Sequence, residues 1–385
     1  MKDCLAAAEE VYREQGEGRV VNREPPRTHI YLPTSKPDIK HVFKSTDGGL
    51  PGFGTQVIRI TSDTIGYKTV KGERRRFKFP SIQGGKYYFG LYLLFRNEDG
   101  APLAMLHDGH INHLGVGARV GVGVKYLAVE EADTVGLFGA GWYGITVLEA
   151  VQAVRPIRKA KVYSPTPENR KKFADEASKE LGIEVIAVDS AKDAVQGSHI
   201  LLTMTNAAGA VFDGNWLEEG ACVVTSAGGD HLESREELDE ETLRRSGLRA
   251  VATRSFAVFI RAYQDSVKKG ILDWNEVPEL GEIIVGKKPG RINGRQRAIF
   301  FQNLPGGAQH CGMATRVYEK ARAAGLGKEL PDEFFLQSLD LKERGGFYDQ
   351  DQRGLPHRDS GQRCRSSRQI LYRDFGYDHR EAQPG

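Results

Sequence analysis

Cysteine, long apolar runs and export signals are all scarce in this chain. Only four of its 385 residues are cysteines, and they lie far apart with no C-x-x-C pair. This spacing argues against a disulfide framework or a zinc cage and favours a reducing compartment. No stretch reaches the roughly 18 consecutive apolar residues that span a bilayer. The first residues, MKDCLAAAEE, include no apolar core of a secretory signal. We therefore expect a soluble, cytoplasmic protein.

Charge of one sign is scarce as well. The chain has 54 Lys and Arg against 51 Asp and Glu, a formal net charge of +3. A balance this close argues against a surface that attracts polyanions over its whole extent. Arginines are frequent after position 341, where acidic residues are interleaved with them and apolar periodicity is weak. We expect residues 342–385 to form a disordered tail, and we expect no nucleic-acid and no membrane partner.

The pattern changes character at Thr134, and a length of 385 residues is typical of about two domains. From there to about Thr253, short apolar runs alternate with helical patterns, which predicts a doubly wound parallel sheet in an α/β fold. The flanking regions mix helices with strand-like runs. Their expected elements are a helix at 4–16, a turn-rich stretch at 25–54, strands at 56–61 and 87–95, a hairpin arm at 101–106, a turn at 107–109, a small-residue helix at 114–128 and a last helix at 308–325.

The strongest chemical signal is a G-x-G-x-x-G motif in GLFGAGWYG. It follows a buried-strand pattern and opens a helix, which is the context that makes this motif a dinucleotide-binding turn. Gly139 permits the tight turn, Gly141 lets backbone N–H groups approach a pyrophosphate, and Gly144 allows close helix–strand packing. The positive end of the helix dipole then faces the phosphates. The predicted cofactor-binding residues of this turn are Gly139, Ala140, Gly141, Trp142, Tyr143 and Gly144.

The choice of cofactor depends on the end of the next strand, at Ser164. A site for NAD usually has an acidic residue here, which holds the ribose 2′-hydroxyl. This chain has the hydroxyls of Ser164 and Thr166 with Arg170 nearby, a set that suits a 2′-phosphate. NADP(H) is therefore favoured, with NAD(H) as the alternative because Glu168 can fold back on the ribose. Cofactor contacts are also expected from two residues after a later strand, Thr205 and Asn206.

Three histidines with metal-like spacing, His107, His110 and His113, precede the small-residue helix. Asp108 is the only acidic residue close to them, and no cysteine completes a ligand set. We expect no metal site here, and interpret the histidines as part of a turn and a helix start.

Several motifs occur in a recognisable order along the chain. A DGH-I turn, the KYLA end of a small-residue helix (Lys125–Ala128) and GLFGAGWYG are followed by the segments Thr203–Asp230, REELDEETL and Val317–Phe335. Taken together, from about Cys4 to Leu341, this order resembles the ornithine cyclodeaminase/μ-crystallin family of NAD(P)-dependent enzymes. The resemblance implies a homodimer in which a Rossmann domain is inserted in a mixed α+β substrate and dimerisation domain. Residues 131–305 would form the Rossmann domain, and residues 1–130, completed by 306–341, the other.

The resemblance also assigns substrate-binding residues. The family's early arginine, which grips the substrate carboxylate, matches Arg27, and a guanidinium fork suits that task. The family's lysine, a donor or proton handler, falls at Arg59. Lys68 is the nearest lysine and is expected to lie beyond the strand. Arginine holds an anion but hardly exchanges protons, because its pKa lies above about 12.

Two further family positions lie later in the chain. The arginine that usually begins the small-residue helix is replaced by Gly115, and Arg119 lies one helical turn later, within reach of the same pocket. Asp230 matches the carboxylate beside the substrate nitrogen, where it can stabilise an iminium and shuttle a proton. Gln309 matches a family glutamine, whereas its neighbour His310 replaces a common acidic residue.

Three functions fit these residues. The first is an NAD(P)-dependent oxidoreductase that reduces a C=N bond, or oxidises an amine, next to a carboxylate. The second is a cyclodeaminase, in which hydride is borrowed and returned while ammonia leaves. The third is a non-catalytic, cofactor-dependent binding protein of the μ-crystallin type. In the first, Arg27 and Arg59 hold the substrate anion and Asp230 manages the nitrogen proton.

Overall fold

The computed structural model describes most of the chain as far as Pro331. The described residues are 1–24, 27–70, 73–79, 88–207, 209–226, 236–257, 261–302, 306–331 and Phe335. Met1–Gly327 form one compact unit and Lys328–Gly385 a second. The tail predicted at 342–385 lies outside the described residues. No helix among the described residues is long and apolar enough to cross a membrane.

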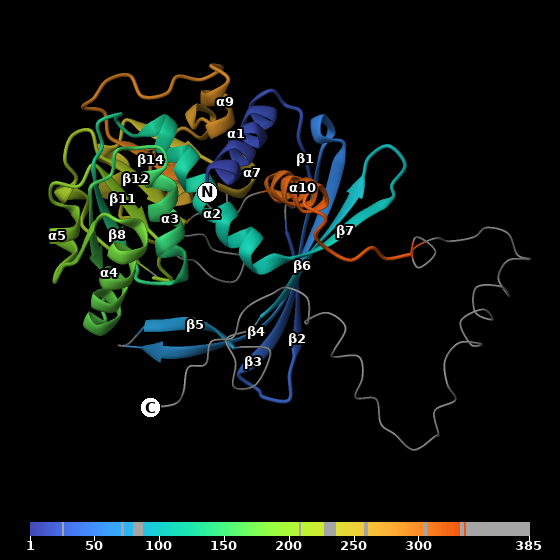
Figure 1. Cartoon of the computed structure of the whole chain (residues 1–385). Coiled ribbons are helices and arrows are strands. Elements are labelled where there is room, and N and C mark those ends of the chain that lie inside the picture. The colour runs from blue at the N-terminus through green and yellow to red at the C-terminus, as the bar shows by residue number, and fades with distance from the viewer. Residues whose placement is uncertain are drawn as a thin grey trace, which may run out of the picture. The chain divides into compact units, whose positions relative to one another are not determined.

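In the described residues, an antiparallel sheet of seven strands forms the first half of the unit Met1–Gly327 (Figure 1). Its central path runs β1-β3-β4-β6-β7, with β2 paired to β3 and β5 paired to β4. The strands are β1 (Val21–Asn22), β2 (Thr28–Pro33), β3 (Ile39–Leu50), β4 (Thr55–Val70), β5 (Glu73–Phe79), β6 (Phe89–Arg96) and β7 (Pro102–His107), with a 3-10 turn η1 (Pro51–Phe53) between β3 and β4.

The prediction of a turn-rich stretch at 25–54 is wrong, because β2 and β3 occupy most of it. Pairing along the whole of β3 with β4 outweighs the weak strand propensity of its glycines. Gly48 has a packing reason as well, since a Cβ there would lie 2.6 Å from the backbone nitrogen of Ala308. Gly48 therefore lets α10 approach the sheet rather than marking a loop.

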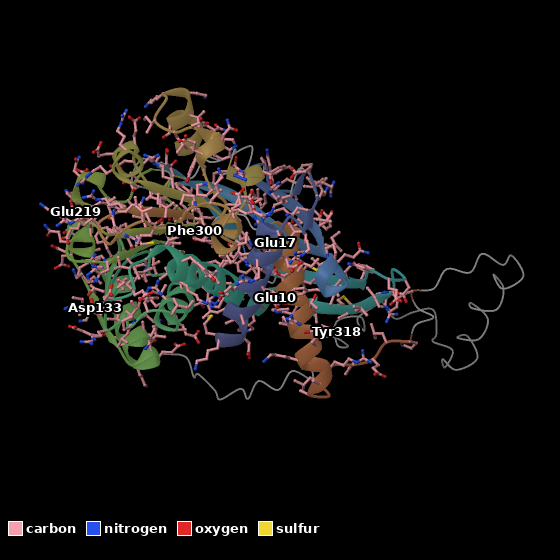
Figure 2. All side chains as sticks on the ribbon, turned by 90° about the horizontal axis from the view of Figure 1, so that it is seen from above. Glu10, Glu17, Asp133, Glu219, Phe300 and Tyr318 are labelled. Carbon is pink, nitrogen blue, oxygen red and sulfur yellow. The ribbon has the colours of Figure 1, made fainter. Side chains whose placement is uncertain are left out.

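Side chains alternate between the two faces of this sheet, and the faces differ. One face packs on α10 (Gly307–Ala323), and α10 also contacts α1 (Lys2–Gly16). Figure 2 shows α1, which carries Glu10 and is followed by Glu17, beside α10, which carries Tyr318. The buried cluster between them is apolar; it includes Val11, Leu50, Val57, Tyr92, Leu94, Met313 and Ala314.

A parallel sheet, with seven strands in the part of the chain that the structure describes, forms the second half and confirms the predicted doubly wound architecture. Its order is β10-β9-β8-β11-β12-β14-β13, so the topological switch point lies between β8 and β11. The strands are β8 (Thr134–Phe138), β9 (Lys159–Tyr163), β10 (Glu184–Ala187), β11 (Ile200–Thr203), β12 (Cys222–Thr225), β13 (Leu248–Val251) and β14 (Ala298–Phe301). The helical segments are α3 (Trp142–Gln152), α4 (Pro167–Leu181), α5 (Ala191–Val195), η2 (Gly214–Trp216), α6 (Glu240–Arg245), α7 (Arg254–Ala257), α8 (Arg261–Lys268), η3 (Trp274–Glu276) and α9 (Leu280–Ile284).

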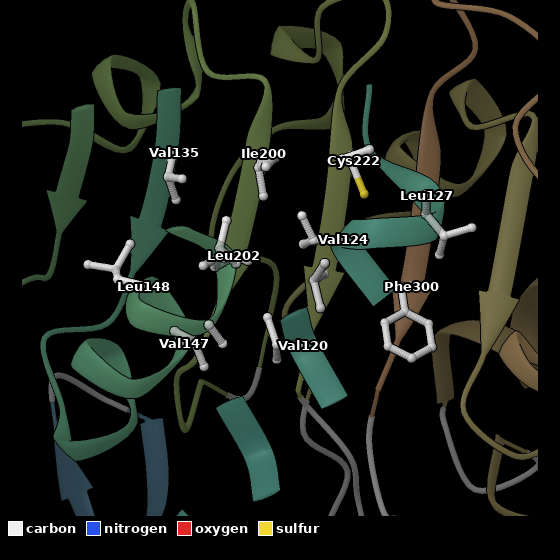
Figure 3. Close-up of a cluster of buried hydrophobic side chains, with 14 of the residues drawn as sticks. Val120, Val124, Leu127, Val135, Val147, Leu148, Ile200, Leu202, Cys222 and Phe300 are labelled. Atoms are coloured by element: carbon white, nitrogen blue, oxygen red, sulfur yellow. The ribbon is translucent and has the colours of Figure 1, made fainter. Parts of the chain in front are cut away.

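The long helix α2 (Asp108–Leu127) connects the two sheets. Its C-terminal half, with Val120, Val124 and Leu127, packs among side chains of β11, β12 and β14 (Figure 3). The helix begins at Asp108, earlier than predicted, so the expected turn at 107–109 is wrong. Strand β7 ends at His107 and leads directly into the helix, and Asp108 in the first turn suits the positive end of its dipole.

Candidate functional site

The glycine turn between β8 and α3 has the geometry that the motif predicts. Gly139 has φ +105°, and a Cβ there would lie 2.5 Å from the backbone oxygen of Met204, so only glycine fits. A Cβ on Gly144 would lie 2.6 Å from the Phe173 ring, which shows that this glycine lets α3 approach α4. Gly141, the N-cap of α3, has open space where its Cβ would be. The turn therefore offers an exposed helix N-terminus that a pyrophosphate fits.

The neighbouring residues of the turn line the same edge of the parallel sheet. Trp142 begins α3 with 60% of its surface exposed, and Tyr143 accepts a hydrogen bond from the Asn112 side chain at 3.0 Å. His113 stacks on the Trp142 ring at a centroid distance of 4.1 Å and hydrogen-bonds Thr146. Burial lowers the pKa of His113 to about 4, with a smaller contribution from His110. This imidazole is therefore neutral beside the turn.

A buried carboxyl group, Glu237, joins the ends of β11 and β12. It accepts hydrogen bonds from the Thr203 and Thr225 hydroxyls, both at 2.8 Å, and from the backbone and hydroxyl of Thr205 at 2.5 and 2.7 Å. Glu237 is only 1% exposed, and burial raises its pKa although the threonine hydrogen bonds oppose the rise. The buried Glu237 carboxyl group thus holds the loop with Thr205 and Asn206 in place. Sequence reasoning missed Glu237, because its partners lie on two strands earlier in the chain.

The end of β9 carries the residues predicted to select the cofactor. Arg170 donates to the backbone oxygen of Ser164 at 3.0 Å and to Asp189 at 2.6 Å, so its guanidinium supports this loop from beneath. Thr166 is the N-cap residue of α4, and its side chain makes no cap hydrogen bond. No carboxylate precedes Glu168 at this strand end.

A row of polar side chains crosses the antiparallel sheet at one register. Arg59 on β4 lies opposite Thr46 on β3 and Tyr92 on β6. Its guanidinium forms a two-pronged ion pair with Asp108, at 2.6 and 2.9 Å. Burial alone lowers the pKa of Arg59, but Tyr92 and Asp108 outweigh it and raise the pKa above its ordinary value. Arg27 joins the row through Thr46, to which its Nε donates at 3.3 Å.

Arg119 approaches this row from α2 and is almost fully buried, at 2% exposure. Its Nε donates to Gln302 at 3.4 Å, whereas its two terminal nitrogens donate to no described residue. No described carboxylate pairs with it, and burial lowers its pKa. A buried guanidinium with an open fork has the shape and charge that bind a carboxylate.

His310 on α10 lies in the electrostatic field of all three arginines. Its Nδ1 lies 3.1 Å from the Tyr92 hydroxyl, and its buried Nε2 has no hydrogen-bond partner among the described residues. Burial, and then Arg59, Arg119 and Arg27, hold the pKa of His310 well below its ordinary range. The adjacent Gln309 is also buried, and its Nε2 has no partner in the described part of the chain. No spacing of residues along the chain signals this gathering.

One other predicted residue, Lys68, is not brought to this row. The expectation that Lys68 lies beyond the strand is wrong, since β4 continues to Val70. It lies in the half of β4 that pairs with β5, and its ammonium is 5.4 Å from the centre of the Phe77 ring. Asp230 lies outside the described residues. Among those described, no group of three or more His, Cys, Asp or Glu side chains is placed to hold a metal ion.

Comparison with known proteins finds enzymes that are similar to this chain in sequence and fold. A model of the ornithine cyclodeaminase/mu-crystallin family matches residues 33–325. A Δ1-pyrroline-2-carboxylate reductase of Bacillus cereus is 28% identical over 293 residues, covering 75% of this chain and 83% of the relative. The structure of Thermococcus litoralis Δ1-pyrroline-2-carboxylate reductase with NADH and L-proline is 29% identical, with a TM-score of 0.72, and the match covers 86% of this chain and 96% of that one. An archaeal alanine dehydrogenase dimer with bound NAD shares the fold, with a TM-score of 0.71, 24% identity and coverage of 86% and 94%.

Proposed function

The chain belongs to the ornithine cyclodeaminase/mu-crystallin family, and from this premise we propose that it reduces the C=N bond of a small imino acid. It is an enzyme that uses a nicotinamide cofactor and acts on C=N or CH–NH bonds of amino or imino acids. The observation that carries the proposal is the buried, open fork of Arg119 beside Arg27 and Arg59. A carboxylate next to the reacting bond is the group that such a cluster recognises.

The three arginines divide the work of holding that carboxylate. Arg119 offers two terminal nitrogens, and Arg27 reaches the same row through Thr46. Arg59 is bound by Asp108 and contributes a fixed positive charge beside the substrate. It exchanges no proton, because an arginine side chain stays protonated. The nitrogen proton is assigned to Asp230, because this residue matches the family's carboxylate beside the substrate nitrogen. We give no role to Lys68, whose ammonium lies over the aromatic rings of β5.

The nicotinamide cofactor supplies or accepts the hydride when it is bound. The residues Gly139–Gly144 hold its phosphates at the N-terminus of α3, and Thr205 and Asn206 lie at the next strand end across the switch point. Glu237 keeps that strand end in place through its threonine hydrogen bonds.

We further propose that NADP(H) is preferred over NAD(H). The support is the absence of a carboxylate between Ser164 and Pro167 together with the hydroxyls of Ser164 and Thr166 at this strand end. Replacing Ser164 by Asp would place a carboxylate where it repels a 2′-phosphate and binds a 2′-hydroxyl. The ratio of kcat/KM for NADPH to that for NADH should fall at least tenfold in Ser164→Asp. A wild-type ratio below one contradicts the preference.

A homodimer is also proposed, through the outer face of the antiparallel sheet. Strand register places five large apolar side chains on the face opposite Arg59, each about half exposed in the described part of the chain: Val21, Ile30, Leu32, Phe89 and Met105. An apolar surface of this kind marks an interaction site. Sedimentation should give a dimer for the wild type and a monomer for Ile30→Lys combined with Met105→Lys. Residues 1–130 with 306–341 would then form the substrate and dimer part, and 131–305 the cofactor part.

Turnover of a defined substrate panel tests the reaction. Δ1-pyrroline-2-carboxylate should be reduced with loss of absorbance of NADPH or NADH, and L-proline should be oxidised slowly in reverse. Release of ammonia from ornithine with catalytic NAD would instead support the cyclodeaminase. Cofactor binding without turnover of any amino or imino acid would leave the μ-crystallin type of binding protein.

A further inference from the structure

Gly115 faces a different neighbour from the other glycines in the body of α2. A Cβ on Gly117 would lie 2.5 Å from Thr146, one on Gly121 2.5 Å from Leu5, and one on Gly123 2.2 Å from Phe300. Those three glycines let other elements pack closely against the helix. A Cβ on Gly115 would instead lie 3.2 Å from Nη1 of Arg119. The next atom, Met313 Cγ, lies at 3.6 Å, which is ordinary contact.

The arginine side chain runs back along the helix toward Gly115. Side chains on an α-helix lean toward its N-terminus, so a residue one turn later covers the position before it. Arg119 does this, since its Nη1 lies 3.2 Å from the place that a Cβ at position 115 would take. The Arg119 side chain therefore points toward the start of α2, where Asp108 binds Arg59.

The other end of the guanidinium is held by the parallel sheet. Its Nε donates to Gln302, which follows β14, and the Gln302 amide donates to the Ser226 hydroxyl just beyond β12. The Ser226 hydroxyl in turn donates to the sulfur of Met204, beyond β11. The guanidinium is therefore fixed at one end by the cofactor edge of the sheet and has room at the other because residue 115 is glycine.

We infer that Gly115 determines substrate specificity, because its missing side chain lets the Arg119 fork lie where the carboxylate of a small imino acid binds. This inference rests on the proposed function and adds a residue that touches neither substrate nor cofactor. A glycine inside a helix is less stable than an alanine at the same position. Nothing packs against Gly115 tightly enough to require glycine except the guanidinium. The helix thus keeps a less stable residue at a position where binding needs it.

The variant Gly115→Ala separates binding from folding. The added methyl must displace Nη1 by a few tenths of an ångström, so we expect KM for Δ1-pyrroline-2-carboxylate to rise about fivefold. The melting temperature should rise, because alanine favours the helix. The KM of the cofactor should stay unchanged. Gly294→Ala is the matched control, since its Cβ would meet nothing within 4 Å, and it should leave all three values unchanged.

A double-mutant cycle identifies Arg119 as the group through which Gly115 acts. In an Arg119→Ala background, Gly115→Ala should change KM no further, because the displaced group is gone. The dissociation constant of pyrrole-2-carboxylate, an unreactive planar analogue, should follow the same pattern by calorimetry in the presence of oxidised cofactor. Additive effects of the two substitutions, or a Gly115→Ala protein with wild-type KM and analogue affinity, would overturn the inference.

Failure of the proposed function gives a different result. A wild-type protein that neither reduces Δ1-pyrroline-2-carboxylate nor binds pyrrole-2-carboxylate with either cofactor would overturn both the reaction and the role of Gly115. A wild type that does both, together with an unaffected Gly115→Ala variant, would overturn the role of Gly115 alone.

Discussion

The two halves of the site are built in different ways. The dinucleotide turn comes from one continuous segment, Gly139–Gly144, between a strand and the helix that follows it. The arginine row is assembled from Arg27, Arg59 and Arg119, together with Tyr92 and His310, which lie on different parts of the chain. A local turn needs particular backbone angles, which restrict its residue types, so it can be recognised in the sequence. An assembled row depends on strand register and helix packing, which a single sequence does not display.

The largest effect is expected from breaking the substrate half at Arg119. Arg119→Met keeps an apolar stem of similar length but removes the fork, so kcat/KM for Δ1-pyrroline-2-carboxylate should fall about 100- to 1,000-fold. Steady-state kinetics measure this, and Arg96→Met is the control because Arg96 is an exposed arginine paired with Asp99. A loss below tenfold would show that Arg119 does not bind the substrate.

The cofactor half should break at Gly139. Gly139→Ala forces a side chain into φ +105° and against the backbone oxygen of Met204, so cofactor affinity should fall about 30-fold and stability by about 2 kcal/mol. Gly182→Ala is the matched control, because Gly182 has φ +66° with nothing within 4 Å of its Cβ. It should cost stability and leave cofactor affinity unchanged. Equal cofactor affinities in Gly139→Ala and Gly182→Ala would show that Gly139 has no specific role in cofactor binding.

Glu237 offers a subtler change in the same half. Glu237→Gln replaces an acceptor oxygen by an NH₂ group facing threonine hydroxyls, so the loop at Thr205 should loosen. We expect the cofactor KM to rise about fivefold with a smaller change in substrate KM. A change in stability without any change in cofactor KM would assign Glu237 to folding alone.

Each half of the site contains a neutral histidine. The contributions of these two histidines to the pH dependence of stability can therefore be compared. The pKa of His113 falls to about 4 and that of His310 lies well below 6.5, in both cases chiefly through burial. The unfolded chain binds protons below pH 6.5 that the folded chain does not, so stability is full above this pH and declines as pH falls toward 4. In urea unfolding, the free energy of unfolding should decline less with falling pH in His310→Gln than in His113→Gln, since His310 is the more buried. Equal slopes in the wild type and both variants would contradict this.

The smallest effect is expected at Lys68. Its ammonium lies over the rings of Phe77 and Phe79, away from the arginine row. Lys68→Met should leave kcat/KM within about twofold of wild type, because it removes only two cation–π contacts of an exposed side chain. A larger loss would make Lys68 a catalytic candidate again.

Particular residues show how far sequence reasoning reaches. The parallel sheet was predictable because strand-like and helical runs alternate along the sequence. The glycine turn was predictable because its backbone, with a positive φ at Gly139, requires glycines at fixed spacing. Strands β2 and β3 were not, because prolines and glycines conceal strands whose stability comes from pairing with β4. Arg119 was found by helical spacing from Gly115, whereas Glu237 was missed and the position of His310 beside Tyr92 needed the packing of α10 on the sheet.

Calorimetric titration of wild type and Arg119→Met tests the account most directly. NADPH or NADH should bind both proteins with equal affinity, because the glycine turn is untouched. Pyrrole-2-carboxylate should then bind the wild type in the presence of oxidised cofactor and give no heat with Arg119→Met. Absence of coenzyme binding by the wild type, or equal binding of the analogue by both proteins, would contradict a site made of one dinucleotide turn and one buried guanidinium fork.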